Sequence, residues 1–327
     1  MSRVLRYLAA LNEAIALEME RDEQVFMVGE DIRENLRGET KGLFARFGGE
    51  RVLDAPISEA AFTGLATGAA MAGMRPIVEL QIPSLVYVAF DQIVNQAAKL
   101  RLMLGGQVSV PVTYLVMAAG ARTGLAGQHS DNPYPLLAHA GVKVVCPGTP
   151  YDVKGLTISA IRDDDPVAVI APAASLGMRG EVPEGSYTIP LGSGVVRREG
   201  TDVTLVAVGH VVNIAMDVAQ NLEADGIDVE VWDPRSVHPL DIEGLCASVA
   251  KTGRLVVAED ANPVCGFAAE IIAVVAERTP TALKASPVRV TRAHIPIPFS
   301  GPLETASLVG PAQIADAVRL LLSRQAV

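Results

Sequence analysis

The first half of the chain alternates short apolar runs with longer stretches of helical periodicity. The apolar runs lack polar alternation, which is typical of strands that are buried on both faces of a parallel sheet. The predicted strands lie at 25–28, 76–81, 110–116, 142–146 and 167–170. Apolar positions at helical spacing predict helices at about 4–20, 59–73, 87–104 and 151–162. This alternation indicates a parallel sheet flanked by helices.

The pattern fails over residues 172–194, a stretch rich in Gly, Pro and Ser that is typical of a linker. The alternation then resumes, with strands predicted at 203–208, 227–232, 254–258 and 288–291. Helices are predicted there at about 211–224, 240–250, 267–278 and 311–323. We therefore predict two α/β domains, each a mainly parallel sheet flanked by helices, at 1–175 and 201–327, with a linker at 176–200.

Composition agrees with this organisation and excludes some functions. The 327 residues suggest about two domains at roughly 100–200 residues each. The chain is 50% hydrophobic and 20% charged, which excludes disorder as its main state. Lys and Arg number 27 and Asp and Glu 37, so the net charge is 27 − 37 = −10. Such a balance argues against nucleic-acid binding, which needs a concentrated positive face.

The cysteines and the N-terminus bear on location. Cys146, Cys246 and Cys265 are far apart and form no CxxC pair, which fits a reducing compartment. The first residues are typical of an amphipathic helix interrupted by charges and not of a signal peptide. Apolar runs stay below the roughly 18 residues that a membrane span needs. We expect a cytoplasmic protein with no membrane partner.

Common catalytic motifs are missing from the sequence. It has no GxGxxG after a strand, no GxxxxGK[ST], no HExxH and no GxSxG. The five histidines show no spacing typical of metal ligands. These absences weigh against a dinucleotide enzyme, a P-loop enzyme and a zinc hydrolase.

The segment APISEAAFTGLATGAAMAG, at 55–73, contains a candidate catalytic acid. Pro56 interrupts the preceding structure, Ser58 is a good N-cap, and Glu59 falls in the first helical turn. An acid in a first turn commonly does no more than complement the helix dipole, worth about 0.3–1 kcal/mol. Here its neighbours are apolar and would hold water away from the carboxylate. Carboxylates in such settings are candidate catalytic groups.

Nine segments, which keep their order along almost the whole chain, carry a resemblance to a known family. The chain resembles the β subunit of the thiamine-diphosphate-dependent decarboxylating component of 2-oxo acid dehydrogenases, a transketolase-like family that includes the pyruvate, branched-chain and acetoin enzymes. The segments are VGEDI (28–32), DAPISEAAFTGLATGAAMAGMRPIVE (54–79), AFDQIVNQAAK (89–99), GQHS (127–130), VVCPGTPYDVKGL (144–156), SAIRDDDPV (159–167), TLVAVG (204–209), DPRSVHPLD (233–241) and EDANPVCGFAAEI (259–271).

The resemblance implies a fold and an activity. The first domain would bind the pyrimidine half of thiamine diphosphate, and the second would serve subunit contact and complex docking. The carboxyl of Glu59 would bind the aminopyrimidine and promote formation of the cofactor ylide. The enzyme would decarboxylate a 2-oxo acid and pass the acyl group to the lipoyl group of a dihydrolipoyl acyltransferase core.

The resemblance also assigns other positions to the site. Glu30, Ile57 and Gln81 would lie in the cofactor pocket. Position 85 is usually aromatic in the family and is Leu85 here, which removes a ring contact worth about 0.5–1.5 kcal/mol. His129, in the GQHS segment, would be the second catalytic residue, near the reacting carbonyl or the site of acyl transfer.

Metal ions and partners follow from the same resemblance. Some family members bind potassium through backbone carbonyls at the positions of Ala160, Asp163 and Asp165; a charged turn after a helix is the alternative interpretation. The sequence lacks the Gly-Asp-Gly motif that marks the diphosphate and Mg²⁺ site of thiamine enzymes. An α subunit would therefore hold Mg²⁺ and share the cofactor in an α2β2 heterotetramer, which also contains a second β subunit.

Three other interpretations stay open. The chain could be the β subunit of an acetoin dehydrogenase. It could be a catalytically idle scaffold, which Leu85 and the altered VMAAG loop (116–120) favour and Glu59 and His129 oppose. It could also be a self-sufficient thiamine enzyme, which the missing Gly-Asp-Gly motif and the short length oppose.

Overall fold

The computed structural model describes residues 2–121 and 124–324. The chain divides into two compact units between Leu191 and Gly192. Each unit contains its own sheet and its own apolar core, so each is described by itself.

The first unit is built on a sheet of parallel strands. Its six strands, in spatial order, are β6 (Lys143–Val145), β7 (Val167–Pro172), β5 (Thr113–Ala119), β4 (Arg75–Leu80), β2 (Val25–Gly29) and β3 (Val52–Asp54). Nearly every residue of the central strands β2, β4, β5 and β7 is buried. Burial on both faces explains why the sequence shows continuous apolar runs, and the predicted parallel sheet is confirmed.

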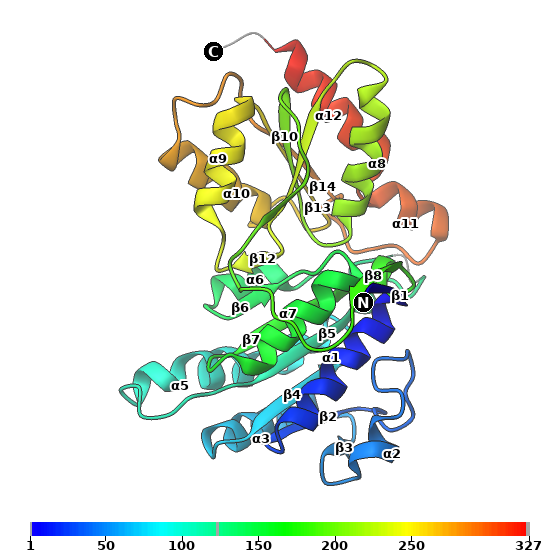
Figure 1. The fold of residues 1–327 in the computed structure, drawn as a ribbon, viewed down its shortest axis with the longest axis vertical. Coiled ribbons are helices and arrows are strands. Elements are labelled where there is room, and N and C mark those ends of the chain that lie inside the picture. The colour runs from blue at the N-terminus through cyan, green and yellow to red at the C-terminus, as the bar shows by residue number, and fades with distance from the viewer. Residues whose placement is uncertain (1, 122–123, 325–327) are drawn as a thin grey trace. The chain divides into compact units, whose positions relative to one another are not determined.

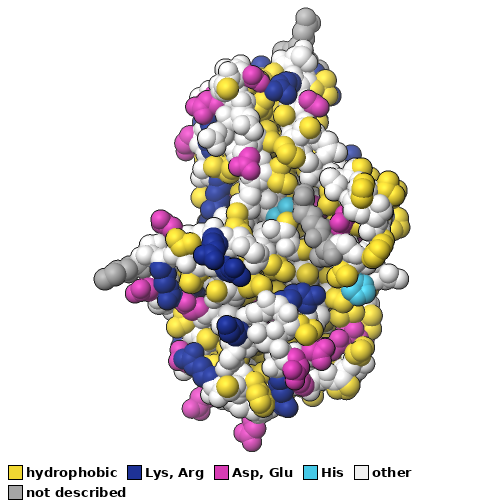
Figure 2. All heavy atoms as spheres, turned by 90° about the vertical axis from the view of Figure 1, so that its right-hand side faces the viewer, with side chains coloured by type: hydrophobic (Ala, Val, Ile, Leu, Met, Phe, Trp, Pro, Cys, Tyr) yellow, Lys and Arg dark blue, Asp and Glu magenta, His cyan; other side chains and the backbone are white. Residues whose placement is uncertain are grey.

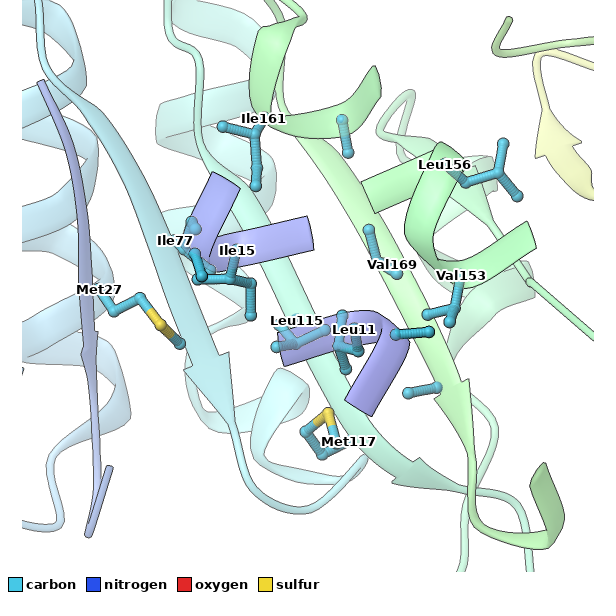
Figure 3. Packing of buried hydrophobic residues seen from close by; sticks show 14 of the residues in the cluster. Leu11, Ile15, Met27, Ile77, Leu115, Met117, Val153, Leu156, Ile161 and Val169 are labelled. Carbon is cyan, nitrogen blue, oxygen red and sulfur yellow. The ribbon is translucent and has the colours of Figure 1, made fainter. Parts of the chain in front are cut away.

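Helices cover this sheet, and the largest core lies under two of them. α1 (Tyr7–Arg21) and α7 (Pro150–Arg162) pack side by side on one face (Figure 1). Leu11 and Ile15 of α1 point toward Leu115 of β5, beside Val153 of α7 (Figure 3). α3 (Glu59–Met71) packs on β4 and contributes nothing to this core. The remaining helices are α2 (Leu43–Phe47), α4 (Leu85–Val88), η1 (Gln92–Ala97), α5 (Ala98–Met103), η2 (Gly127–His129) and α6 (Tyr134–His139).

Three predicted elements differ from the structure. The first helix begins at Tyr7, because residues before it form β1 (Ser2–Arg6), which pairs antiparallel with β8 (Arg179–Pro183). The predicted helix at 87–104 is divided among α4, the π-helical η1 and α5. The stretch at 176–200 contains β8 and β9 (Val195–Arg198), and η3 (Ala173–Ser175) precedes it.

The second unit repeats the same architecture on a smaller scale. Its strands, in spatial order, are β14 (Val288–Thr291), β13 (Leu255–Glu259), β10 (Val203–Ala207), β11 (Val229–Asp233) and the antiparallel edge strand β9. In Figure 1, α8 (Val211–Glu223) and α12 (Pro311–Ser323) flank one face, while α9 (Ile242–Thr252) and α10 (Phe267–Arg278) flank the other. β12 (Ser236–His238) and α11 (Gly301–Ser307) complete the unit. Across the described residues of both units, no helix is long and apolar enough to cross a membrane.

Candidate functional site

The candidate site lies at the carboxyl ends of two neighbouring parallel strands, where α/β sheets place their ligands. Glu30 follows β2 directly and Gln81 follows β4 directly. Gln81 is 6% exposed, and its Nε2 donates to the backbone carbonyl of Glu30 over 3.0 Å. The guanidinium of Arg37 donates to its Oε1. Both ends of the Gln81 amide are therefore fixed, and its side chain joins the two strand ends.

Glu59 is the first residue of α3 and is 5% exposed. Ser58 occupies the predicted N-cap position, but its side chain makes no capping bond. Its Oγ instead donates to the carbonyl of Pro56 over 2.9 Å. The start of the helix therefore presents the Glu59 carboxyl without a competing side-chain cap.

Glu30 and Glu59 form a carboxyl pair. Burial raises the pKa of Glu30, and the charges of Glu59 and Asp31 together with a hydrogen bond to the Glu59 carboxyl raise it further. Oε1 of Glu30 is buried and has no hydrogen-bond partner among the described residues. Because an ionised carboxylate only accepts hydrogen bonds, one of the two carboxyls must carry a proton for the bond between them to form. The pair can therefore hold a proton next to a buried oxygen that lacks a hydrogen-bond partner among the described residues.

The apolar slot predicted around Glu59 has a different origin. Its neighbours Ile57, Ala60 and Ala61 are exposed, Ile57 to 84%, and only Phe62 is buried. The reason is geometric, since α3 turns Phe62 toward the sheet and leaves the other side chains on its outer face. Its apolar neighbours in sequence are thus not what buries Glu59, whose carboxyl bonds that of Glu30 after β2. The predicted contact of Ile57 with a pyrimidine ring stays a prediction.

A second group of predicted residues meets where α4 begins. Leu85 is the first residue of α4 and is half-buried. Oγ of the preceding Ser84 donates to the carbonyl of Gln128, which places the η2 turn and its half-buried His129 beside that helix start. The hydroxyl of Tyr87, two residues further on, donates to Oδ2 of Asp131 over 2.5 Å.

The VMAAG segment that departs from the family pattern forms the end of β5. The register of β5 against β7 shifts between Val116 and Ala119, and Ala118 adopts a left-handed backbone with φ of 52°. The amide of Gly120 then donates to the carbonyl of Asp131 over 2.7 Å. The loop that follows this irregularity connects β5 to the η2 turn that contains His129. Residues 122–123 of that loop lie outside the described residues.

The predicted potassium ligands come together at the end of α7. Ala160 is buried, and its carbonyl accepts from the amide of Asp163, which follows the helix. The carbonyls of Asp163 and Ile161 accept from Nη1 of Arg75 at 2.9 Å and 3.0 Å. Carbonyl oxygens beside acidic side chains suit a potassium ion, but the Arg75 guanidinium already lies against two of them. Potassium therefore stays a prediction.

The side chains of Asp163 and Asp165 are neutralised by nearby cations. Nζ of Lys143 lies 2.8 Å from the Asp163 carboxylate and 2.9 Å from that of Asp165, and Arg101 also pairs with Asp165. Burial pulls the pKa of Asp165 upward, but the bonds from Lys143 and Arg101 outweigh it and leave that pKa lowered. These contacts stabilise the turn that follows α7.

The sequence analysis missed three charged residues next to the site. Glu79 lies within β4 and Glu39 between β2 and α2, and both are fully buried. Arg37, which holds Gln81, belongs to the same segment as Glu39. A single acid inside the apolar run PIVELQ was a visible signal for Glu79. Nothing in the sequence signalled Arg37 or Glu39, because they reach the site through contacts between distant residues.

On the face drawn in Figure 2, acidic and basic side chains are interspersed with hydrophobic ones, and neither sign forms one continuous patch. In the described residues, no group of three or more His, Cys, Asp or Glu is placed to hold a metal ion.

Comparison with known proteins identifies both units. Residues 4–178 match the family model described as "Transketolase, pyrimidine binding domain", and residues 192–314 match "Transketolase, C-terminal domain". A solved structure described as "Split gene transketolase, inactive beta4 tetramer" superposes with a TM-score of 0.81 at 22% identity, covering 98% of this chain and 99% of that one. This likeness shows the fold of the two units.

Three curated relatives extend along nearly the whole chain. The acetoin:2,6-dichlorophenolindophenol oxidoreductase subunit beta of Cupriavidus necator is 46% identical, covering 98% of each chain. The protein of the same name from Bacillus subtilis is 44% identical, covering 100% of each. The pyruvate dehydrogenase E1 component subunit beta of Rickettsia conorii is 41% identical, covering 95% of this chain and 96% of its own. The predicted family is therefore confirmed.

Proposed function

Since the chain belongs to the transketolase-like family of 2-oxo acid dehydrogenase β subunits, we propose that it is the β half of a thiamine-diphosphate-dependent oxidoreductase. The observation that supports this most directly is the Glu30–Glu59 carboxyl pair at the ends of β2 and α3. Its orphaned oxygen, Oε1 of Glu30, is buried beside the acid that the family motif points to. An acid pair with a spare oxygen fits a ring nitrogen that exchanges a proton.

The residues of this chain then have separate tasks. Glu59 would bind the aminopyrimidine of the cofactor and exchange a proton with it, and Glu30 would keep that proton available through the hydrogen bond that the two side chains share. Gln81, which donates to the backbone carbonyl of Glu30, holds the strand ends together and so keeps the Glu30–Glu59 pair in position. His129, in the η2 turn, would act near the reacting carbonyl of the substrate. When bound, thiamine diphosphate supplies the nucleophilic carbon and the electron sink for cleaving the bond next to that carbonyl.

A separate α subunit completes the site. The chain has no Gly-Asp-Gly motif to hold the diphosphate and Mg²⁺. Its helix α3 carries a single charge, Glu59, and exposes Ala60, Ala61 and Leu65 on the face turned away from the sheet. A helix that is apolar all round is normally buried, so this face suits an α partner. A second β subunit, a dihydrolipoyl acyltransferase core and a cytoplasmic location complete the proposal.

The substrate we favour is acetoin. The two relatives named for acetoin are 44% and 46% identical, against 41% for the relative named for pyruvate. Acetoin and a 2-oxo acid present the same carbonyl, but an aldehyde leaves from one and carbon dioxide from the other. The same carboxyl pair serves either substrate, so a 2-oxo acid is the second candidate.

The test uses the β chain co-expressed with its α-like partner. Reduction of 2,6-dichlorophenolindophenol is followed with acetoin, pyruvate and 3-methyl-2-oxobutanoate, with added thiamine diphosphate and Mg²⁺. We expect turnover with acetoin and a loss of about 10²–10⁴-fold in Glu59→Gln, because a proton-transfer group contributes about that much. Glu50→Gln, at an exposed glutamate of the same unit, is the matched control.

Three outcomes would contradict the proposal. Undiminished turnover in an assembled Glu59→Gln enzyme would remove the carboxyl pair from the reaction. An assembled wild-type complex that turns over none of the three substrates would favour the idle scaffold. Turnover by the β chain alone would favour a self-sufficient thiamine enzyme.

A further inference from the structure

Two glutamates near the site are buried in an unusual way. Glu39 and Glu79 are both fully buried, and their four carboxyl oxygens have no hydrogen-bond partner among the described residues. Burying unpaired carboxylates is expensive, so such groups need either a proton or a nearby cation. Burial raises the pKa of each, and the charge of Glu39 raises that of Glu79 further. The two carboxyls therefore act on one another.

Arg37 lies in the segment that also carries Glu39. Its guanidinium donates to Oε1 of Gln81, across 44 positions of sequence. Its positive charge lowers the pKa of both Glu39 and Glu79, against the effect of burial. Among the described residues, Arg37 is the cation whose charge acts on both carboxyls.

A short series of contacts joins Arg37 to the proposed catalytic acid. Arg37 holds the amide oxygen of Gln81, and Nε2 of Gln81 holds the backbone of Glu30 at 3.0 Å. The side chain of Glu30 then bonds that of Glu59. Moving Arg37 would therefore move the strand end that presents Glu30.

We propose that Arg37 is a positioning residue, which holds the Glu30–Glu59 pair through Gln81 and supplies the positive charge that balances the buried carboxyls Glu39 and Glu79. The positioning part rests on the proposed function, whereas the charge-balancing part concerns the folded chain alone. A buried ion cluster of this kind is costly to break from one side, because removing one partner leaves the others uncompensated.

The charged groups around Glu79 determine whether a substitution raises or lowers the pKa values of the buried carboxyls. Glu79 on β4 faces Glu39 and Arg37 from the segment before α2, and Glu30 and Asp31 from the end of β2. Removing the positive charge leaves only carboxyls, which raise one another's pKa. Removing a carboxyl instead relieves that repulsion. Variants of Arg37 and Glu39 should therefore act in opposite directions.

The first experiment measures the pH profile of kcat/KM in the assembled α–β enzyme. In Arg37→Leu, we expect the acid limb to move upward by about one pH unit, because loss of the cation favours protonated carboxyls. In Glu39→Gln it should move downward, and Arg37→Lys should restore most of the wild-type profile. Arg33→Leu is the matched control, since Arg33 in the same segment binds the carbonyl of Val52 and lies over the ring of Phe44. Identical profiles in all variants of an active enzyme would overturn the positioning role.

The second experiment needs no turnover, so it separates failure of this inference from failure of the proposed function. A raised folded-state pKa means that the stabilisation is fully present below the ordinary carboxyl range and is lost as the pH rises. The melting temperature of the full chain should therefore fall with rising pH, less steeply in Glu39→Gln and Glu79→Gln and more steeply in Arg37→Leu. Arg37→Lys, which keeps the charge, should follow wild type, and parallel curves for wild type, Glu39→Gln and Arg37→Leu would overturn the charge-balancing role.

Discussion

At position 85 a leucine stands where an aromatic ring would stack on a flat ligand. Leu85 is half-buried at the start of α4, and the hydroxyl of the nearby Tyr87 donates to Asp131. We predict that Leu85→Phe tightens thiamine diphosphate binding by about three- to tenfold, since a stacked ring adds roughly 0.5–1.5 kcal/mol. Calorimetric titration of the α–β complex measures this. Val88→Phe, at an exposed position of the same helix, should leave the affinity unchanged.

For single residues, the sequence predicted the site positions that lie within recognisable local segments. Glu59 stands out because it begins a helix, whereas the family resemblance assigned Gln81 to the site. Arg37 and Glu39 did not stand out, because their partners lie about 40 residues away along the chain. Desolvation of Glu59 was expected from adjacent apolar residues, which in fact point outward. Local patterns predict which helix or strand a residue belongs to, whereas the tertiary fold determines which other residues bury it.

Among the elements, α7 depends on one close approach. Gly155 of α7 faces the 187–189 segment, and a Cβ added there would lie 2.7 Å from Cγ1 of Ile189 and 2.8 Å from Cε2 of Tyr187. We predict that Gly155→Ala lowers the free energy of unfolding by about 1–3 kcal/mol through overpacking, despite the better helix propensity of Ala. Gly68→Ala in α3, with nothing within 4 Å, should instead raise it by up to about 1 kcal/mol. Denaturant titration compares them, and equal effects would contradict close packing at Gly155.

The end of α7 gives a prediction about cations. If potassium joins the carbonyls of Ala160, Asp163 and Asp165, the folded chain gains stability in proportion to the free ion. The melting temperature should then be higher in KCl than in NaCl at the same ionic strength. Lys143→Met, which removes a competing positive charge, should increase this difference. The same melting temperature in both salts would show that potassium does not bind these carbonyls, of which that of Asp163 already accepts from Arg75.

Over the whole molecule, the period of the hydrophobic pattern was enough to predict two mainly parallel sheets. It could not place the boundary between the units, because residues 179–183 pair with the N-terminal strand β1 far away in sequence. A Gly- and Pro-rich stretch indicates where helices end, but it does not show whether residues within it form strands that pair with distant segments. Pairings between distant segments are decided by the packed core, which a linear pattern does not contain.

The apolar outer face of α3 gives the last prediction. The helix is held by Phe62 and Ala66 on the side of the sheet, so Leu65, which is 54% exposed, contributes little to the folded chain. If an α subunit covers this face, Leu65→Asp buries an unpaired charge at the interface and should weaken assembly by about tenfold or more. Leu320→Asp, at a 49% exposed leucine of α12, is the matched control. Size-exclusion chromatography of co-expressed chains measures the assembled fraction, while the melting temperature of each free β chain should stay near that of wild type. Equal assembly of both variants would place the α subunit elsewhere, and the Glu30–Glu59 pair would then have to act without the shared cleft on which its proposed chemistry depends.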